Sequence, residues 1–239
     1  GPDHAGEPVP PFLELEYEDG RERGLIATDV CEIVEEPAAF VIRGGHVILG
    51  NDNEEGTVGL AYRKNGHDLL ITNAHVVTDP GVPAGQVTVR LPDGTKAFGV
   101  VRAMNDLGAN VLTSDAALVE MPAGSVSPGK FRGTELALTG LGEFVSNDPR
   151  IFFYVSRDFV HTARWTAFVP GQAGINIDGH AKSCMSFHKL ALTTGQVGPG
   201  NSGAVVFCQT QGGLLATGLL FGGVASINEA WVFPIRRCV

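Results

Sequence analysis

The 239-residue sequence lacks several features that would each indicate a particular class of protein. No apolar run approaches the roughly 18 residues of a membrane-spanning helix, and the first residues of the given sequence do not have the pattern of a signal peptide. No segment offers a net basic surface that could hold phosphates. We therefore expect a soluble protein that binds neither membrane nor nucleic acid.

Cysteine is also scarce, and its spacing is irregular. The four cysteines are Cys31, Cys184, Cys208 and Cys238, and no two of them form a paired motif of the kind that binds zinc. The sequence thus predicts no metal site, and it predicts no cofactor.

Acidic residues are concentrated near the start of the chain. Residues 1–40 hold eleven Asp or Glu against two Arg, a net charge of −9, whereas the remaining residues carry fifteen charges of each sign. Such composition is typical of a solvated arm, and the alternative is a docking segment. We predict that residues 1–39 form an acidic N-terminal leader, with a regulatory partner as one role for it.

The remaining sequence has little helical pattern, with short helical stretches expected only after His75 and within residues 27–39. Its 32 glycines and 14 prolines separate short runs of β-branched and aromatic residues. We predict an all-β fold of two antiparallel six-stranded barrels, at residues 40–124 and 134–239, joined by a linker at 125–133. The strands are expected at 40–49, 56–62, 68–72, 86–91, 97–103 and 115–121, and then at 136–141, 151–156, 164–169, 188–193, 204–208, 214–221 and 230–235.

Three motifs carry the chemistry. Ser202 stands between glycines in Pro199-Gly200-Asn201-Ser202-Gly203, directly before an apolar strand. His75 lies near the end of the largely apolar run 69–77, and Asp115 opens the run 115–119. The chain order His, Asp, Ser is that of chymotrypsin.

These residue types suit nucleophilic catalysis. A serine hydroxyl needs a hydrogen-bonded base, imidazole can act as that base, and a carboxylate can fix the imidazole tautomer. The amides of Gly200 and Ser202 are the expected donors to an oxyanion. Each motif alone has an ordinary explanation, as a turn, a packed histidine or the start of a strand. Asp106 and Asp79 compete with Asp115, but Asp106 precedes no strand and Asp79 is close to His75 in sequence.

With these residues the sequence resembles the trypsin and chymotrypsin superfamily of serine peptidases over residues 40–237. The motifs around His75 and Ser202 look most like the HtrA-type and related bacterial branch, and viral chymotrypsin-like proteases share the plan. The resemblance implies two perpendicular barrels with the site in the cleft between them. It implies substrate binding at Phe221, Gly222 and Gly223, and an opposite pocket wall at 190–199. Because that wall has no Asp or Glu, a preference for Arg or Lys at the cleavage site is not expected.

Two departures from the secreted digestive members carry information. Asn201 stands where zymogen-type members have an aspartate that binds a new N-terminal amine, so activation by that ion pair is not expected. Val76 follows His75 where secreted members have cysteine, and Cys208 faces a family partner position that looks like Leu136. We therefore expect Cys208 to be a reduced core thiol, in a cytoplasmic protein of bacterial or viral origin.

The leading hypothesis is a serine endopeptidase that acts on protein or peptide substrates through an acyl-enzyme, with His75, Asp115 and Ser202 as its triad. One alternative is a catalytically idle protease fold that serves as a binding module. Others are a viral polyprotein-processing protease and an esterase, which would use the same residues.

Overall fold

The computed structural model describes residues 12–16, 23–27, 41–50, 54–78, 85–134, 136–157, 159–177 and 180–238. The chain divides into two compact units, residues 1–38 and residues 39–239. In the first unit, β1 (Phe12–Glu16) and β2 (Arg23–Ala27) form an antiparallel pair, with Phe12 opposite Ala27. The leader thus contains two strands that its acidic composition did not indicate. Apart from Ala27, the residues expected to be helical within 27–39 lie outside the described part of the chain.

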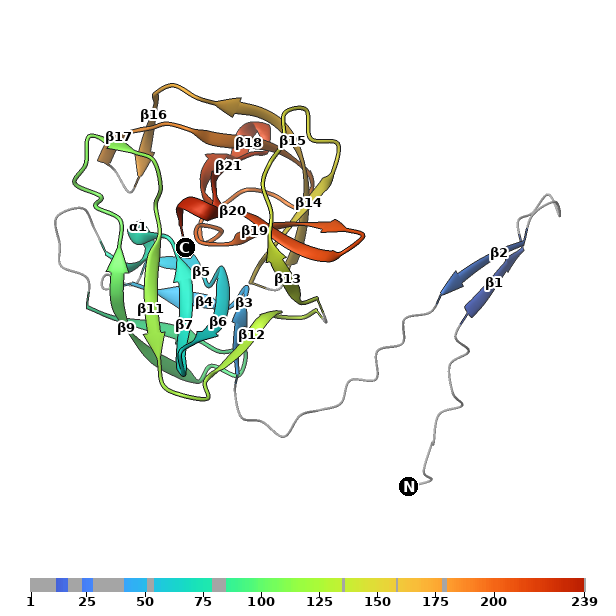
Figure 1. Cartoon of the computed structure of the whole chain (residues 1–239), viewed down its shortest axis with the longest axis horizontal. Coiled ribbons are helices and arrows are strands. Elements are labelled where there is room, and N and C mark those ends of the chain that lie inside the picture. The colour runs from blue at the N-terminus through green and yellow to red at the C-terminus, as the bar shows by residue number, and fades with distance from the viewer. Residues whose placement is uncertain are drawn as a thin grey trace. The chain divides into compact units, whose positions relative to one another are not determined.

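The second unit is built almost entirely of strands (Figure 1). Its first half contains β3 (Ile42–Gly44), β4 (Val47–Leu49), β5 (Glu55–Thr57), β6 (Leu60–Lys64), β7 (His67–Thr72), α1 (Ala74–Val77), β8 (Gln86–Arg90), β9 (Lys96–Met104), β10 (Val111–Leu112), β11 (Ala117–Met121) and β12 (Val126–Phe131). Its second half contains β13 (Leu138–Leu141), β14 (Ile151–Ser156), β15 (Phe159–Val169), β16 (Ala173–Ile177), β17 (His180–Cys184), β18 (Phe187–Thr194), β19 (Val205–Thr210), β20 (Gly213–Val224), β21 (Glu229–Pro234) and two 3₁₀ turns, Ala225–Ile227 and Ile235–Arg237.

The second half closes into a six-stranded barrel. Its strands follow the order β20-β19-β14-β15-β18-β21, and β21 pairs again with β20 to complete the ring. All six pairings are antiparallel, and β13 is added to β20 in parallel. The inward residues form an apolar core that includes Phe152, Tyr154 and Leu190.

The first half forms a curled sheet of order β5-β4-β8-β9-β11-β7-β6. Only Val58 and Gly59 separate β5 from β6. The amide of Val58 donates to His46 O on the β4 side (2.8 Å), and that of Gly59 donates to Ile71 O of β7 (2.8 Å). One bent segment therefore joins both ends of the sheet. The two sheets confirm the predicted all-β fold of two barrels.

A separate core cluster lies between the two sheets. Ile71 and Phe131 from the first half pack with Phe207 and Leu219 from the second, and the rings of Phe131 and Phe207 stack 4.8 Å apart. Each buried side chain of this size stabilises the fold by about 1.5–3 kcal/mol. This cluster holds the two halves together beneath the site.

The structure differs from the sequence predictions in three details. Gly45, with φ of +88°, divides the strand expected at 40–49 into β3 and β4. The expected linker contains β12, which pairs in parallel with β3 because Val126 and Phe131 are buried there. The hairpin of β16 and β17 was not predicted.

Candidate active site

His75 lies in α1, a single helical turn that follows β7. The side chain is 7% exposed, and its Nδ1 lies 2.5 Å from Oδ2 of Asp115. A carboxylate only accepts hydrogen bonds, so Nδ1 carries the ring proton and Nε2 of the neutral ring keeps its lone pair. The imidazole is thus held in the tautomer that a base requires.

Asp115 is placed by strand register. It precedes β11, whose first residue, Ala117, pairs with Thr72 at the end of β7. Its Oδ1 accepts bonds from the amides of Ala74 (2.8 Å) and His75 (3.2 Å), and its carbonyl accepts one from Asn73 Nδ2 (2.6 Å). The carboxylate is fully buried and fixed at both oxygens. Of the two candidate aspartates that the structure describes, Asp115 contacts His75, whereas Asp106 bonds the Gly108 amide; Asp79 lies outside the described residues.

Ser202 lies in the turn before β19. The carbonyl of Ser202 accepts a bond from the amide of Thr57 (2.7 Å), and Thr57 Oγ1 donates to Gly200 O (2.6 Å). Gly203 has φ of +92°, and a Cβ there would lie 2.3 Å from Thr57 O and from Thr72 Oγ1. The turn that carries Ser202 therefore rests directly on the first sheet, and only glycine fits behind the serine.

The backbone amides around Ser202 have unequal roles. Those of Asn201, Gly203 and Ala204 donate to protein carbonyls, whereas those of Gly200 and Ser202 find no acceptor among the described residues. These two amides are the predicted oxyanion donors. Gly200 has φ of +83°, a conformation that favours glycine.

Asn201 is satisfied by neutral partners. Its Oδ1 accepts a bond from the Gly198 amide (2.9 Å), and its Nδ2 donates to Ser156 Oγ (2.6 Å). The side chain is 8% exposed. This arrangement leaves no buried negative charge at the position. That no ion pair with an amine controls this turn stays a prediction.

Two cavities meet at His75 and Ser202. One, of about 160 Å³, is also lined by the predicted substrate residues Phe221, Gly222 and Gly223. Phe221 is 3% exposed, and its ring stacks on Phe233 at 4.1 Å, so it belongs to the core as well. The half-buried Gly222 and Gly223 form the more open part of this wall.

The second cavity, of about 380 Å³, reveals residues that sequence reasoning missed. Arg157, in the connection between β14 and β15, forms an ion pair of 2.5 Å with Glu55 of β5 across the two halves. The Arg157 guanidinium lies against Gly200, where a Cβ would be 2.7 Å from Nη2. Arg157 has φ of +57°, but no motif in the sequence marks it.

The predicted opposite wall lines a third cavity of about 730 Å³, through residues 195–199. Among its described lining residues there is no carboxylate. His161 lies in this cavity with its ring stacked on Tyr154 at 4.4 Å, and burial lowers the pKa of the imidazole.

Cys184, Cys208 and Cys238, the cysteines within the described residues, are all free thiols. Burial raises the pKa of Cys208, and it raises those of Cys184 and Cys238 to about 12. Cys31 lies outside the described residues. In the described part of the chain no group of His, Cys, Asp or Glu is arranged to hold a metal ion, and no helix there is long and apolar enough to cross a membrane.

Solved structures that share this architecture include bacterial serine proteases. Protease A of Thermobifida fusca matches with a TM-score of 0.58 and 14% identity, over 82% of this chain and 93% of that one. A chymotrypsin of Cellulomonas bogoriensis matches with 0.58 and 16%, over 83% and 93%. A glutamic acid-specific serine protease, described as using a histidine triad in substrate binding, matches with 0.58 and 17%, over 82% and 95%.

Because these sequence identities are low, the structural likeness establishes the fold alone. No protein-family model and no curated protein matches the sequence. The chain therefore has the chymotrypsin-like two-barrel fold of trypsin-like serine proteases.

Proposed function

We propose that this protein is a serine endopeptidase that hydrolyses peptide bonds through an acyl-enzyme. The observation that carries the proposal is the His75 to Asp115 contact beside two cavities that His75 shares with Ser202. In this account Ser202 Oγ attacks the substrate carbonyl and passes its proton to His75 Nε2. His75 then gives that proton to the leaving amine, and water completes the cycle by the same route.

The remaining roles follow from the same geometry. The amides of Gly200 and Ser202, which have no acceptor among the described residues, would stabilise the oxyanion. Asp115 would hold the tautomer of His75, and Gly222 and Gly223 would border the bound peptide. We propose that the protein resembles the HtrA-type branch most, because of the motifs around His75 and Ser202. We propose a cytoplasmic location because Cys208 is a free thiol.

A cleavage profile on a peptide library tests this function. Wild-type protein should cut peptides, and Ser202→Ala should abolish cutting while the protein stays folded. We expect few cuts after Arg or Lys, because the described residues that line the third cavity include no carboxylate. Activity that persists in Ser202→Ala, or folded wild-type protein that cuts neither peptides nor esters, would favour the idle binding module. Cutting of esters alone would favour an esterase.

For residues 1–39 we propose a regulatory docking role, because the net charge of the chain is concentrated there. Removing this segment should change the rate at which a small peptide is cut, and high salt should mimic removal by screening the charges. An unchanged rate would reduce the segment to a solvated arm.

A further inference from the structure

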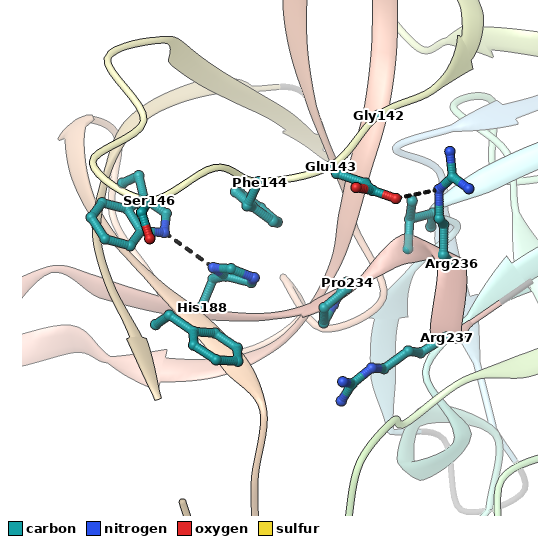
Figure 2. Close-up of a pocket in the computed structure, with 11 residues that line it drawn as sticks. Gly142, Glu143, Phe144, Ser146, His188, Pro234, Arg236 and Arg237 are labelled. Atoms are coloured by element: carbon teal, nitrogen blue, oxygen red, sulfur yellow. Dashed lines mark hydrogen bonds and ion pairs between the residues drawn. The ribbon is translucent and has the colours of Figure 1, made fainter. Parts of the chain in front are cut away.

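A separate cavity of about 390 Å³ lies in the second barrel, between the β13–β14 connection, strands β15 and β18, and residues 234–237 (Figure 2). It shares no lining residue with the two cavities at His75 and Ser202. Its volume is within the range of small-molecule sites. The proposed protease mechanism makes no use of it.

Aromatic rings surround the centre of this cavity. The His188 ring stacks on Phe144 at 4.2 Å and lies 4.9 Å from Phe168. Trp165 Nε1 donates to His188 Nδ1 (3.1 Å), so the proton of the neutral imidazole is on Nε2. Burial, with the nearby charge of Arg237, lowers the pKa of His188 to about 4, so the ring is neutral near pH 7. His188 therefore offers an Nε2–H donor, which has no partner among the described residues.

The charges at the edge of the cavity are unbalanced. Arg236 Nε pairs with Glu143 Oε1 at 3.0 Å, as the dashed line in Figure 2 shows. Arg237 makes one long bond, to Ser186 O at 3.4 Å, and no carboxylate within the described ranges pairs with it. The cavity thus has one guanidinium available beside an apolar, aromatic wall.

We propose that this cavity binds a flat aromatic group that carries a carboxylate. The ring would pack against Trp165, Phe168 and Pro234, and the carboxylate would accept bonds from Arg237 and from His188 Nε2–H. Planar guanidinium is well matched to a carboxylate, and bonds of this kind are among the stronger ones in proteins. An aromatic amine is disfavoured because the carboxylate of Glu143 is already paired. Free aromatic acids and peptide carboxyl termini that end in an aromatic residue share this chemistry.

The proposal is tested by titrating the full chain with 3-phenylpropionate and, as its matched control, 3-phenylpropylamine. The two indole N–H signals in a proton–nitrogen NMR spectrum, assigned with Trp231→Phe, report separately on this cavity and on the cleft. We expect the acid to shift the Trp165 signal in a saturable manner and to leave Trp231 unchanged. The amine should bind at least about tenfold more weakly.

Two variants test whether binding depends on the charge of Arg237 or on a general change in the folded structure. Arg237→Gln should weaken binding of 3-phenylpropionate by about tenfold, because it removes the unpaired guanidinium from an exposed position. The double variant Glu143→Gln with Arg236→Gln removes an ion pair without changing the net charge, and it should alter binding by less than about twofold. No saturable shift of Trp165 at millimolar acid, equal binding of the amine, or unchanged binding in Arg237→Gln would each overturn the proposal.

A further comparison separates the two sources of the ligand. A short peptide that ends in Phe with a free carboxylate is set against the same peptide with an amide end. Binding of the free-carboxylate peptide, but not of the peptide with the amide end, would assign the cavity to carboxyl termini. Binding of 3-phenylpropionate but of neither peptide would assign it to small aromatic acids. Equal binding of both peptides would contradict the role of the carboxylate.

Discussion

At the residue scale, the Asp115 carboxylate constrains the candidate site most tightly. Its two oxygens accept bonds from the Ala74 and His75 amides and from the His75 ring, and it is fully buried. An ordinary aspartate at the start of a strand does not need these partners. The arrangement instead fixes one tautomer of one imidazole, which is the property that the proposed mechanism uses.

Replacing Asp115 with Asn should therefore remove activity without removing the fold. If the amide oxygen keeps the backbone bonds, its NH₂ group donates to His75 Nδ1, which moves the ring proton to Nε2 and removes the base. We expect kcat to fall roughly ten-thousand-fold, with a small change in KM. Asp106→Asn is the control, because that exposed side chain bonds only the Gly108 amide among the described residues, and it should keep near wild-type rates. Comparable losses in both variants would contradict the assignment.

His188 gives a prediction about pH and stability. Burial lowers the native pKa to about 4, whereas the unfolded value is about 6.5. Between these values the unfolded chain binds more protons, so this group makes stability decrease as the pH falls from about 6.5 toward about 4. His188→Gln keeps an acceptor for Trp165 but does not titrate. Urea unfolding at about pH 7.5 and about pH 5 should show a smaller loss of stability in the variant than in the wild type. Equal losses would contradict the shift.

At the element scale, the turn that carries Ser202 is shaped by what lies behind it. Gly203 and Gly94 both have positive φ, of +92° and +86°, but a Cβ at Gly94 would meet nothing within 4 Å. Gly94→Ala should lower the free energy of unfolding by about 1–2 kcal/mol, because alanine is disfavoured in the left-handed conformation. Gly203→Ala adds a collision with Thr57 and Thr72, which should cost on the order of 1–3 kcal/mol more and displace Ser202. Thermal unfolding and peptide cleavage of the pair measure both effects, and equal behaviour of the two variants would show that the turn is not held against the first sheet.

The elements also show which features could be predicted from sequence. Strands β7, β8, β14 and β18 to β21 follow β-branched and aromatic runs bounded by turn residues, and the structure has them within a few residues of their predicted bounds. The sequence could not show the β16–β17 hairpin, whose residues carry no clear alternation, or the division at Gly45, which depends on one dihedral angle.

The candidate site likewise contains residues that could be predicted from sequence and residues that could not. His75, Asp115 and Ser202 could be found because each precedes or follows an apolar run in a recognisable motif, although their catalytic roles stay a prediction. Arg157 and Glu55 could not be found, because they lie 102 positions apart and meet only when the two sheets pack. The cavity that contains His188 is formed by four separate segments, and no local pattern indicates it.

At the scale of the whole molecule, the candidate site depends on contact between the two halves of the second unit. His75 and Asp115 come from the first half, whereas Ser202 and Gly200 come from the second. Thr57 joins them through bonds to the Ser202 and Gly200 carbonyls, above the shared core of Phe131 and Phe207. Neither half contains a complete site, so the proposed activity requires both barrels to be folded and docked.

In the proposed mechanism Ser202 is a nucleophile that His75 activates in the folded protein. Reaction with a fluorophosphonate, followed by mass spectrometry of the labelled peptide, tests it most directly. We expect one adduct, on Ser202, that disappears in Ser202→Ala and forms far more slowly in His75→Ala. Folded wild-type protein that does not react, or a label that persists in Ser202→Ala, would contradict it.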